Sequence, residues 1–188
     1  MTSSSEHLIK RQLALGLAKV QIVKVLGGII KPEGTAENVD FDKINHLHCK
    51  EVNNKWRTSI ARQGITLNWH KKIIKRREKI DVSIHCNGFL CGLMLAQYSR
   101  NKINVNLRLL EGCPYPKENP LLGNLIPIAL IVAEQFALAY AALQVTISNP
   151  EKGLISRYRQ YGYELIPKDR DRERRNCPIR GKLLIKNT

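Results

Sequence analysis

A site for an anion is predicted where a loop meets a long apolar segment of the chain. Gly123 and Asn124 end this loop, and the apolar segment begins at Leu125 and extends to residue 143. The first N–H groups of a helix have no partner inside the helix, so they point outward and attract negative charge. A phosphate or a similar group could therefore bind at the start of this segment.

The segments around this loop predict a β-α-β unit. One strand-like run covers residues 104–110 and a second covers residues 144–147, with the apolar segment between them. A helix-like segment, residues 153–160, follows the second run, and Gly162 ends it. Strands that alternate with helical segments of this length are typical of neighbouring parallel strands. Glu111 follows the first strand directly and is the carboxylate that the unit would position.

A β-hairpin precedes this unit, in residues 80–95. Its two strand-like runs are separated only by Asn87 and Gly88, whose preference for positive φ suits a two-residue type I′ turn. Pairing outward from this turn predicts the register Cys86–Phe89, Ile84–Cys91 and Val82–Leu93. One face of the hairpin would be wholly apolar. His85 would lie on the other face, either in a cleft or as a partly buried structural histidine.

An N-terminal helix is predicted from the apolar and basic residues between positions 6 and 26. Two interpretations stay open, since this helix could pack on the domain or lie on a membrane or a partner. We expect residues 1–39 to be an N-terminal helical extension and residues 40–188 to form one domain, which is long enough to bury its own core.

Two further helices are predicted between this extension and the hairpin. Residues 42–63 would form the first, with Asp40 or Asp42 as its cap. Residues 69–79 would form the second, with Asn68 as its cap. The second carries a dense basic patch, which either binds a polyanion or is a solvated helix face.

The charge of the chain is its most unusual property. It contains 31 Lys and Arg residues against 16 Asp and Glu residues, a formal net charge of +15. The positive electrostatic field of such a chain attracts nucleic acid, anionic lipid or a phosphate-rich cofactor. It argues against a polycationic substrate, which the field would repel. A basic surface that only confers solubility is the alternative.

A second basic stretch, residues 167–176, is predicted to be an exposed loop that joins two closing strands. The strands are expected at residues 163–166 and 181–185. Arg174, Arg175 and Arg180 could contact phosphates through bidentate hydrogen bonds, or could simply be solvated.

Metal binding and membrane insertion are not expected. His46, His48 and Cys49 lie close together, but a structural zinc site needs four ligands, usually as two spaced pairs, and no second pair follows. Five cysteines without C-x-x-C spacing suggest reduced thiols and a cytoplasmic protein. The longest apolar run, residues 121–133, is shorter than the roughly 20 residues that a membrane span requires.

The predicted order of elements over residues 40–188 resembles the GCN5-related N-acetyltransferase (GNAT) superfamily. The resemblance implies a mixed α/β fold, a central mixed β-sheet flanked by helices, here with an extra N-terminal helix. The family's loop Gln/Arg-x-x-Gly-x-Gly/Ala binds the pyrophosphate of acetyl-CoA. Residues 120–125 are its equivalent, with Gly123 at the first glycine, Pro120 in place of Gln/Arg and Leu125 in place of the second small residue.

The residues after the second strand also resemble the family. Asn149 ends that strand, and the segment from Tyr158 to Tyr163 resembles the family's Tyr-x-x-x-Gly-Phe. The resemblance implies that Tyr158 is a general acid for the departing thiolate, with Glu111 as the candidate base. A core-facing aromatic is the alternative for Tyr158. The residues implied to bind the cofactor are Leu110, Gly123, Asn124, Leu125 and Asn149.

We therefore expect an acetyl-CoA-dependent N-acetyltransferase that acts on an unknown amine, without a metal. Weak nucleic-acid binding and a homodimer are further expectations. The alternative is a non-catalytic module of GNAT-like fold that binds nucleic acid through its basic surface. It rests on the two basic stretches and on the missing second glycine of the loop.

Overall fold

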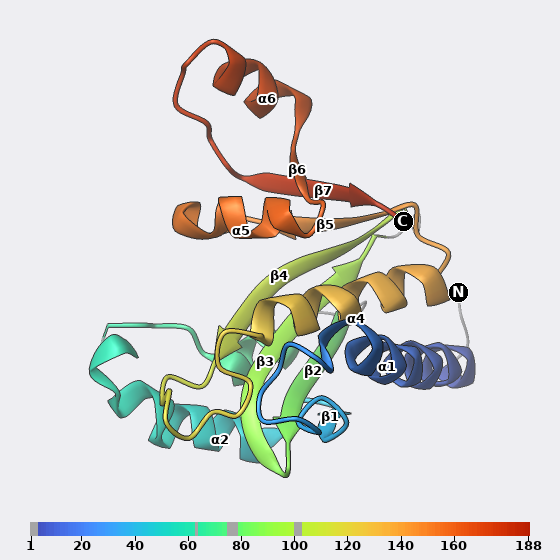
Figure 1. The fold of residues 1–188 in the computed structure, drawn as a ribbon, viewed down its shortest axis with the longest axis vertical. Helices are drawn as coiled ribbons and strands as arrows, with labels where there is room; N and C mark the ends of the chain where they lie inside the picture. The colour runs from blue at the N-terminus through green and yellow to red at the C-terminus, as the bar shows by residue number, and fades with distance from the viewer. Residues whose placement is uncertain (1–3, 63, 75–78, 100–102) are drawn as a thin grey trace.

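The computed structural model describes residues 4–62, 64–74, 79–99 and 103–188 (Figure 1). Within these residues, seven strands form one sheet in the order β1-β2-β3-β4-β5-β7-β6. The strands are β1 (Val39–Asp42), β2 (Lys79–Cys86), β3 (Phe89–Tyr98), β4 (Asn104–Gly112), β5 (Gln144–Ser148), β6 (Glu164–Leu165) and β7 (Leu183–Asn187). No helix in the described part of the chain is both long enough and apolar enough to cross a membrane.

The predicted β-α-β unit is confirmed. Strands β1 to β4 are paired antiparallel in chain order, whereas β4 and β5 are parallel. The connection between β4 and β5 contains helix α4 (Leu125–Ala139), whose inner residues are almost all apolar. Strand β7 then pairs antiparallel with β5, and the short β6 pairs with β7. This arrangement places the parallel pair in the middle of a mixed sheet.

Helices cover both faces of the sheet. Helix α1 (Ser4–Leu26) packs along α4 on one face through Ala14, Ala18 and Ile22, which are four residues apart and fully buried. Because this inner face belongs to the same apolar cluster as α4 and β2, the N-terminal helix packs on the domain. The division into an extension and a domain stays a prediction.

The opposite face of the sheet has its own apolar cluster, centred on Trp56 and Trp69. It is covered by α2 (His46–Asn54), two 3-10 turns (Trp56–Thr58 and Ile60–Arg62) and α3 (Trp69–Ile74). Side chains alternate along β3, so that Met94 belongs to the α4 side while Leu93 belongs to the α2 side.

The predicted hairpin forms, but its register differs from the prediction beyond the first pair. Cys86 is opposite Phe89 as predicted, whereas Ile84 is opposite Gly92 and Val82 is opposite Met94. The cause is a β-bulge at Ile84 and His85, which leaves an extra residue in β3. A bulge shifts the side chains beyond it to the other face, and the hydrophobic pattern of β3 cannot reveal it because its residues are apolar on both faces.

The two helices predicted before the hairpin are confirmed only in part. The proposed helix 42–63 is shorter, because residues 39–42 form β1 and the cap is Asn45, whose side chain accepts from the N–H groups of Leu47 and His48. In α3 the predicted cap is confirmed, with Asn68 Oδ1 accepting from Lys71 N at 3.0 Å. The part of that predicted helix in residues 75–78 lies outside the described residues.

The predicted loop 167–176 is instead largely helix α6 (Pro167–Arg174). Proline at the first helical position, Asp169 in the first turn and arginines in the last turn are all favourable for a helix. The lack of apolar residues hides these signals, because a helix without an apolar stripe has no hydrophobic periodicity.

Candidate functional site

The candidate site is a cleft between β4 and β5, where the two parallel strands separate. Their pairing extends only from Asn104–Gln144 to Leu107–Ile147, and Figure 1 shows the strands diverging beyond it. A β-bulge in β4 leaves Arg108 unpaired with β3 at this point. The cleft that opens there has a volume of about 240 Å³. Backbone groups of both strands beyond the last pair can therefore bond to a ligand rather than to each other.

Tyr158 lies in this cleft, on helix α5 (Ile155–Gln160). Its side chain is only 5% exposed, and burial raises the pKa of the phenol above its ordinary value of 10. The negative charge of Glu151 raises this pKa further, while Arg157 lowers it. The phenol therefore keeps its proton at neutral pH, as a proton donor must.

Two of the residues predicted to bind the cofactor line the same cleft, namely Leu110 and Asn149. The loop residues Gly123, Asn124 and Leu125 do not line it. They lie at the start of α4, where Gly123 has a φ of +78° and Asn124 is the N-cap without a side-chain capping bond. A left-handed φ at this position favours glycine, which explains why this glycine of the loop is present.

Leu125 packs against the sheet rather than lying open. A Cβ atom added at Gly92 would come within 2.4 Å of a Leu125 methyl carbon, and one added at Gly112 within 2.9 Å. The side chain thus fills space that two glycines leave on β3 and β4. Since Pro127 has no N–H, the first turn of α4 presents the N–H groups of Leu125 and Ile126.

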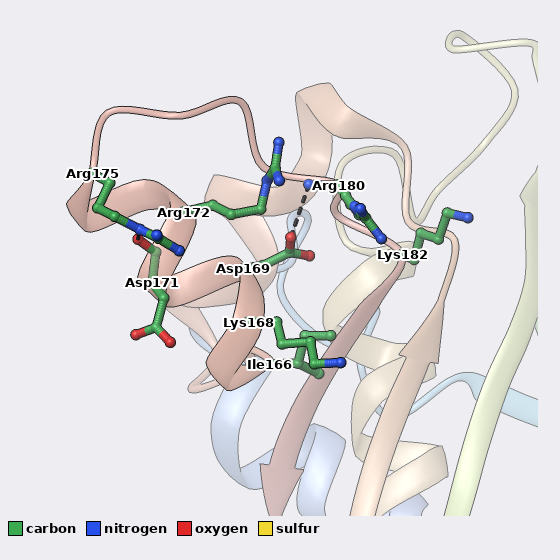
Figure 2. A pocket seen from close by; sticks show the side chains of 8 residues that line it. All are labelled: Ile166, Lys168, Asp169, Asp171, Arg172, Arg175, Arg180 and Lys182. Atoms are coloured by element: carbon green, nitrogen blue, oxygen red, sulfur yellow. Dashed lines mark hydrogen bonds between the residues drawn. The ribbon is translucent and has the colours of Figure 1, made fainter.

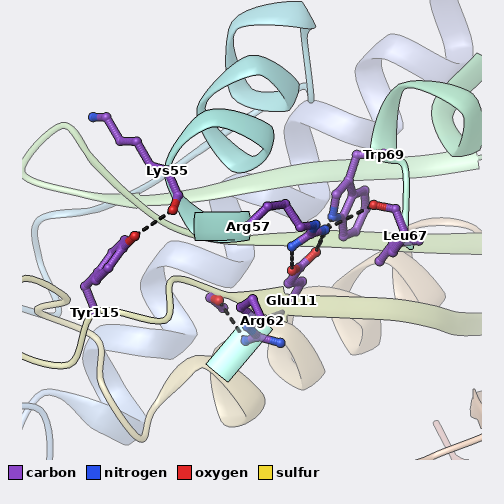
Figure 3. Close-up of polar contacts among 8 residues, drawn as sticks. Lys55, Arg57, Arg62, Leu67, Trp69, Glu111 and Tyr115 are labelled. Carbon is purple, nitrogen blue, oxygen red and sulfur yellow. Dashed lines mark hydrogen bonds and ion pairs between the residues drawn. The ribbon is translucent and has the colours of Figure 1, made fainter. Parts of the chain in front are cut away.

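Glu111 lies in a different environment, shown in Figure 3. Its carboxylate is 4% exposed and forms a two-bond ion pair with Arg57, one bond of which is 2.9 Å long. The indole Nε1 of Trp69 donates to the same carboxylate at 2.6 Å, and Arg57 also donates to Leu67 O at 3.1 Å. Glu111 does not line the β4–β5 cleft. The structure therefore does not place it in one cavity with Tyr158.

Three charged residues of the site were missed by the sequence reasoning. Arg108 and Glu151 line the cleft, and Arg157 donates a hydrogen bond to Gly123 O, which joins α5 to the loop before α4. Arg157 directly precedes Tyr158 and Glu151 follows Asn149 by two residues, so proximity to predicted site residues was the available signal. No sequence signal pointed to Arg108, because its place in the cleft depends on the β-bulge in β4, and a bulge is not visible in the sequence of a strand.

The histidines of α2 have local roles. His48 Nδ1 accepts from the backbone N–H of Asn45 at 3.3 Å, which completes a capping box at the start of the helix. Its ring lies 5.1 Å from that of His85, and burial lowers the pKa of His48, with the neighbouring His85 lowering it further. Within the described residues, no group of three or more metal-ligating side chains comes together.

Comparisons with known proteins identify the fold. No protein-family model matches the sequence, and no curated protein matches it. Among solved structures, a GNAT-family acetyltransferase from Staphylococcus aureus Mu50 is similar, with a TM-score of 0.53 and 11% identity over 79% of this chain and 98% of that one. An aminoglycoside 6'-N-acetyltransferase in complex with coenzyme A gives a TM-score of 0.52 at 11% identity, over 79% and 96% of the two chains.

A third similar structure is N-acetylglutamate synthase from Neisseria gonorrhoeae, in complex with coenzyme A and N-acetyl-glutamate. Its TM-score is 0.51 at 14% identity, and the match covers 79% of this chain but only 35% of that protein. These likenesses show that the chain has the mixed α/β fold of the GNAT acyltransferases, so the predicted fold class is confirmed. Identities this low show the fold, while the function has to be argued from the site.

Proposed function

We propose that this protein is an acetyl-CoA-dependent N-acetyltransferase. The observation that carries the proposal is the buried, protonated Tyr158 in a cleft between two diverging parallel strands, beside the start of α4. The similar structures support it, since they include acetyltransferases and two of them hold coenzyme A. The acceptor would be an amine whose identity stays open, and a homodimer and a cytoplasmic location stay predictions.

The described residues fit acetyl-CoA as a cosubstrate. Its diphosphate would bind the N–H groups of Leu125 and Ile126 at the start of α4, beside Gly123 and the guanidinium of Arg157. Its amide-containing arm would pair with the free backbone groups of β4 and β5, next to Leu110 and Asn149. Asn124 would contribute as the N-cap, because its side chain makes no capping bond; its Nδ2 donates to Leu122 O at 3.2 Å and would exchange this exposed bond for one to the ligand.

Acetyl-CoA supplies a thioester, from which an amine can take the acetyl group. Tyr158 holds a proton at its hydroxyl oxygen and gives it to the sulfur that departs. The attacking amine must be neutral, so a base has to take its proton. Burial raises the pKa of the Tyr158 phenol, so the hydroxyl still carries its proton when the sulfur departs.

Two carboxylates are proposed for the base. Glu111 is the residue that the resemblance suggested, but both of its oxygens already accept hydrogen bonds from Arg57. Glu151 is exposed and lines the same cleft as Tyr158, so an amine that enters the cleft could reach it directly or through water. We favour Glu151 as the base and Glu111 as a positioning residue.

Thermal unfolding with and without acetyl-CoA tests the proposal. A ligand at 100 times its Kd adds about 2.7 kcal/mol to the free energy of unfolding. For a domain of this size that corresponds to a rise in Tm of roughly 5–10 °C. The absence of a shift with millimolar acetyl-CoA, and also with longer acyl-CoAs, would contradict the proposal. If the protein then bound RNA tightly at physiological salt, the non-catalytic alternative would be the better account.

A further inference from the structure

A second cavity lies beneath helix α6, in the segment between β6 and β7, and is shown in Figure 2. Its volume is about 390 Å³. We name it the α6 cavity. Five basic and two acidic residues line it together with Ile166, and they are Lys168, Arg172, Arg175, Arg180, Lys182, Asp169 and Asp171.

Both acidic residues of the α6 cavity are already bonded. Asp169 is 1% exposed, and its two oxygens accept from the backbone N–H groups of Arg180 at 2.9 Å and Gly181 at 3.0 Å. Asp171 forms an ion pair with Arg174, which does not line the cavity. Asp169 therefore serves to hold the loop against α6 rather than to neutralise the basic side chains.

The five basic residues of the cavity form no ion pair with a carboxylate in the described part of the chain. The neighbouring arginines do form such pairs, namely Arg159 with Glu173, Arg170 with Glu164 and Arg174 with Asp171. The structure thus separates the cations of this region into paired ones outside the cavity and unpaired ones around it.

Two of the guanidinium groups are held in place by the backbone. Arg172 Nε donates to Pro178 O at 2.7 Å, and Arg175 Nε donates to Asp171 O at 3.1 Å. A guanidinium bonded through Nε still presents its terminal N–H groups in a fixed plane, which suits the oxygens of a phosphate. Figure 2 shows the side chains of Lys168, Arg180 and Lys182 along the same side of α6.

We propose that the α6 cavity binds the phosphate group of a small molecule. Like charges gathered in a concave site repel one another, and an anion with two or more charges relieves that repulsion. Its volume falls within the usual range of small-ligand sites, about 300–1,000 Å³. A polynucleotide, by contrast, would use the paired arginines outside the cavity as well, since phosphates along its backbone reach every exposed cation.

The cavity adjoins the β4–β5 cleft. Asn149, which lines the cleft, donates its backbone N–H to Lys182 O at 2.8 Å, and Lys182 lines the cavity. The bound phosphate therefore has two sources, the ribose phosphate of CoA or a separate small phosphate ester. The inference rests on the geometry of the cavity and not on the proposed acetyl transfer.

Calorimetric titration of the whole protein with inorganic pyrophosphate tests the inference. The cavity variant is Lys168→Ala/Arg180→Ala/Lys182→Ala, which removes three exposed side chains. The matched control is Lys152→Ala/Arg159→Ala/Arg170→Ala, which removes three exposed charges that lie outside the cavity and pair with none of its residues. Both variants lower the net charge equally, so a difference between them reports the site and not the overall field.

We expect pyrophosphate affinity to fall at least tenfold in the cavity variant and less than threefold in the control. Equal losses in both variants, no loss in either, or no binding by the unmodified protein at millimolar pyrophosphate would overturn the inference. Circular dichroism of both variants checks that the fold is kept.

Titration with CoA and with dephospho-CoA then identifies the source of the phosphate. If the cavity variant weakens the binding of CoA but not of dephospho-CoA, the ribose phosphate of CoA occupies the cavity. If it weakens neither while pyrophosphate binding is lost, the ligand is a separate phosphate ester. Because pyrophosphate binding needs no acetyl-CoA, a failure of the proposed function would leave this measurement unaffected.

Discussion

Trp69 donates its indole N–H to the buried carboxylate of Glu111 at 2.6 Å, and the same carboxylate is paired with Arg57. This relationship joins three parts of the chain, because Trp69 begins α3, Arg57 lies in a 3-10 turn and Glu111 is near the end of β4. The contacts hold the helical layer of residues 46–74 on the sheet. They suggest that Glu111 acts mainly on stability and on the position of β4.

Removing the Glu111 carboxylate should therefore destabilise the protein. In Glu111→Ala, the Arg57 guanidinium, 15% exposed, would lose its charged partner. Removal of one partner from a buried ion pair costs about 3–5 kcal/mol. We expect a loss of about 3 kcal/mol in the free energy of unfolding, measured with urea. Glu173→Ala, which breaks an exposed pair with Arg159, is the control and should cost less than about 1 kcal/mol.

The pH dependence of the rate distinguishes the two candidate bases. A carboxylate accepts a proton only when it is ionised, so loss of the base removes the lower limb of the pH profile of kcat/KM. We expect Glu151→Gln to lower kcat/KM and to remove this limb. Glu111→Gln should keep the lower limb, because Glu111 is not the base in our proposal. The amide oxygen of the variant can still accept the hydrogen bond from Trp69. The opposite pattern would assign the base to Glu111.

Tyr158→Phe tests the general acid. The change removes one hydroxyl from a side chain that is 5% exposed and leaves its packing intact. General acid catalysis contributes about 10²–10⁴-fold to a rate. We expect kcat to fall by about 10²-fold or more with little change in acetyl-CoA affinity, as steady-state kinetics and calorimetry would measure. Equal losses in kcat and in affinity would instead support the core-aromatic interpretation.

The upper limb of the pH profile provides an independent check on Tyr158. Burial raises the pKa of the phenol above 10, so the proton is retained until the pH exceeds that value. A proton donor is lost only as the pH rises through the raised pKa. The upper limb of kcat should therefore lie above pH 10, over the range where the fold persists, and should be absent from the residual activity of Tyr158→Phe. If Tyr158→Phe showed an upper limb at the same pH as the unmodified protein, the limb would belong to the titration of another group.

Local patterns were sufficient to predict most of the sheet. Asn87 and Gly88 specify their turn through backbone preference, and the apolar run after Leu125 specifies α4. Strand β1 was missed because it has only four residues, 39–42, too few for their alternation of apolar residues and aspartates to identify a strand. Its place is determined by pairing with β2, a contact between distant parts of the sequence that propensity cannot report.

The site was predictable only in part for the same reason. Tyr158 could be found from the segment that ends in Gly162 and Tyr163, because that signal is local. The partners of Glu111 could not be found from a local signal, because Arg57 and Trp69 are 54 and 42 residues away from it in the sequence. Nor could the sequence show which arginines of residues 157–180 are paired, because the pairing depends on how α5, α6 and β6 pack.

Arg157→Ala tests the proposed binding of the diphosphate at the start of α4. Arg157 is half-buried and bonded to Gly123 O, so its position is defined before a ligand binds. A hydrogen bond to a charged group contributes about 1.5–3 kcal/mol, and 1.4 kcal/mol corresponds to a factor of about ten in affinity. We therefore expect acetyl-CoA affinity, measured by calorimetry, to fall about tenfold or more.

The matched control is Arg159→Ala, on the same helix, which removes an exposed arginine paired with Glu173. It should change acetyl-CoA affinity less than threefold. Acetyl-pantetheine carries the same thioester but no diphosphate, so Arg157→Ala should lower kcat/KM with this shorter donor much less than it lowers kcat/KM with acetyl-CoA. A similar loss with both donors would show that Arg157 only supports the loop at Gly123, and the diphosphate would then have to be bound by the N–H groups of Leu125 and Ile126 alone.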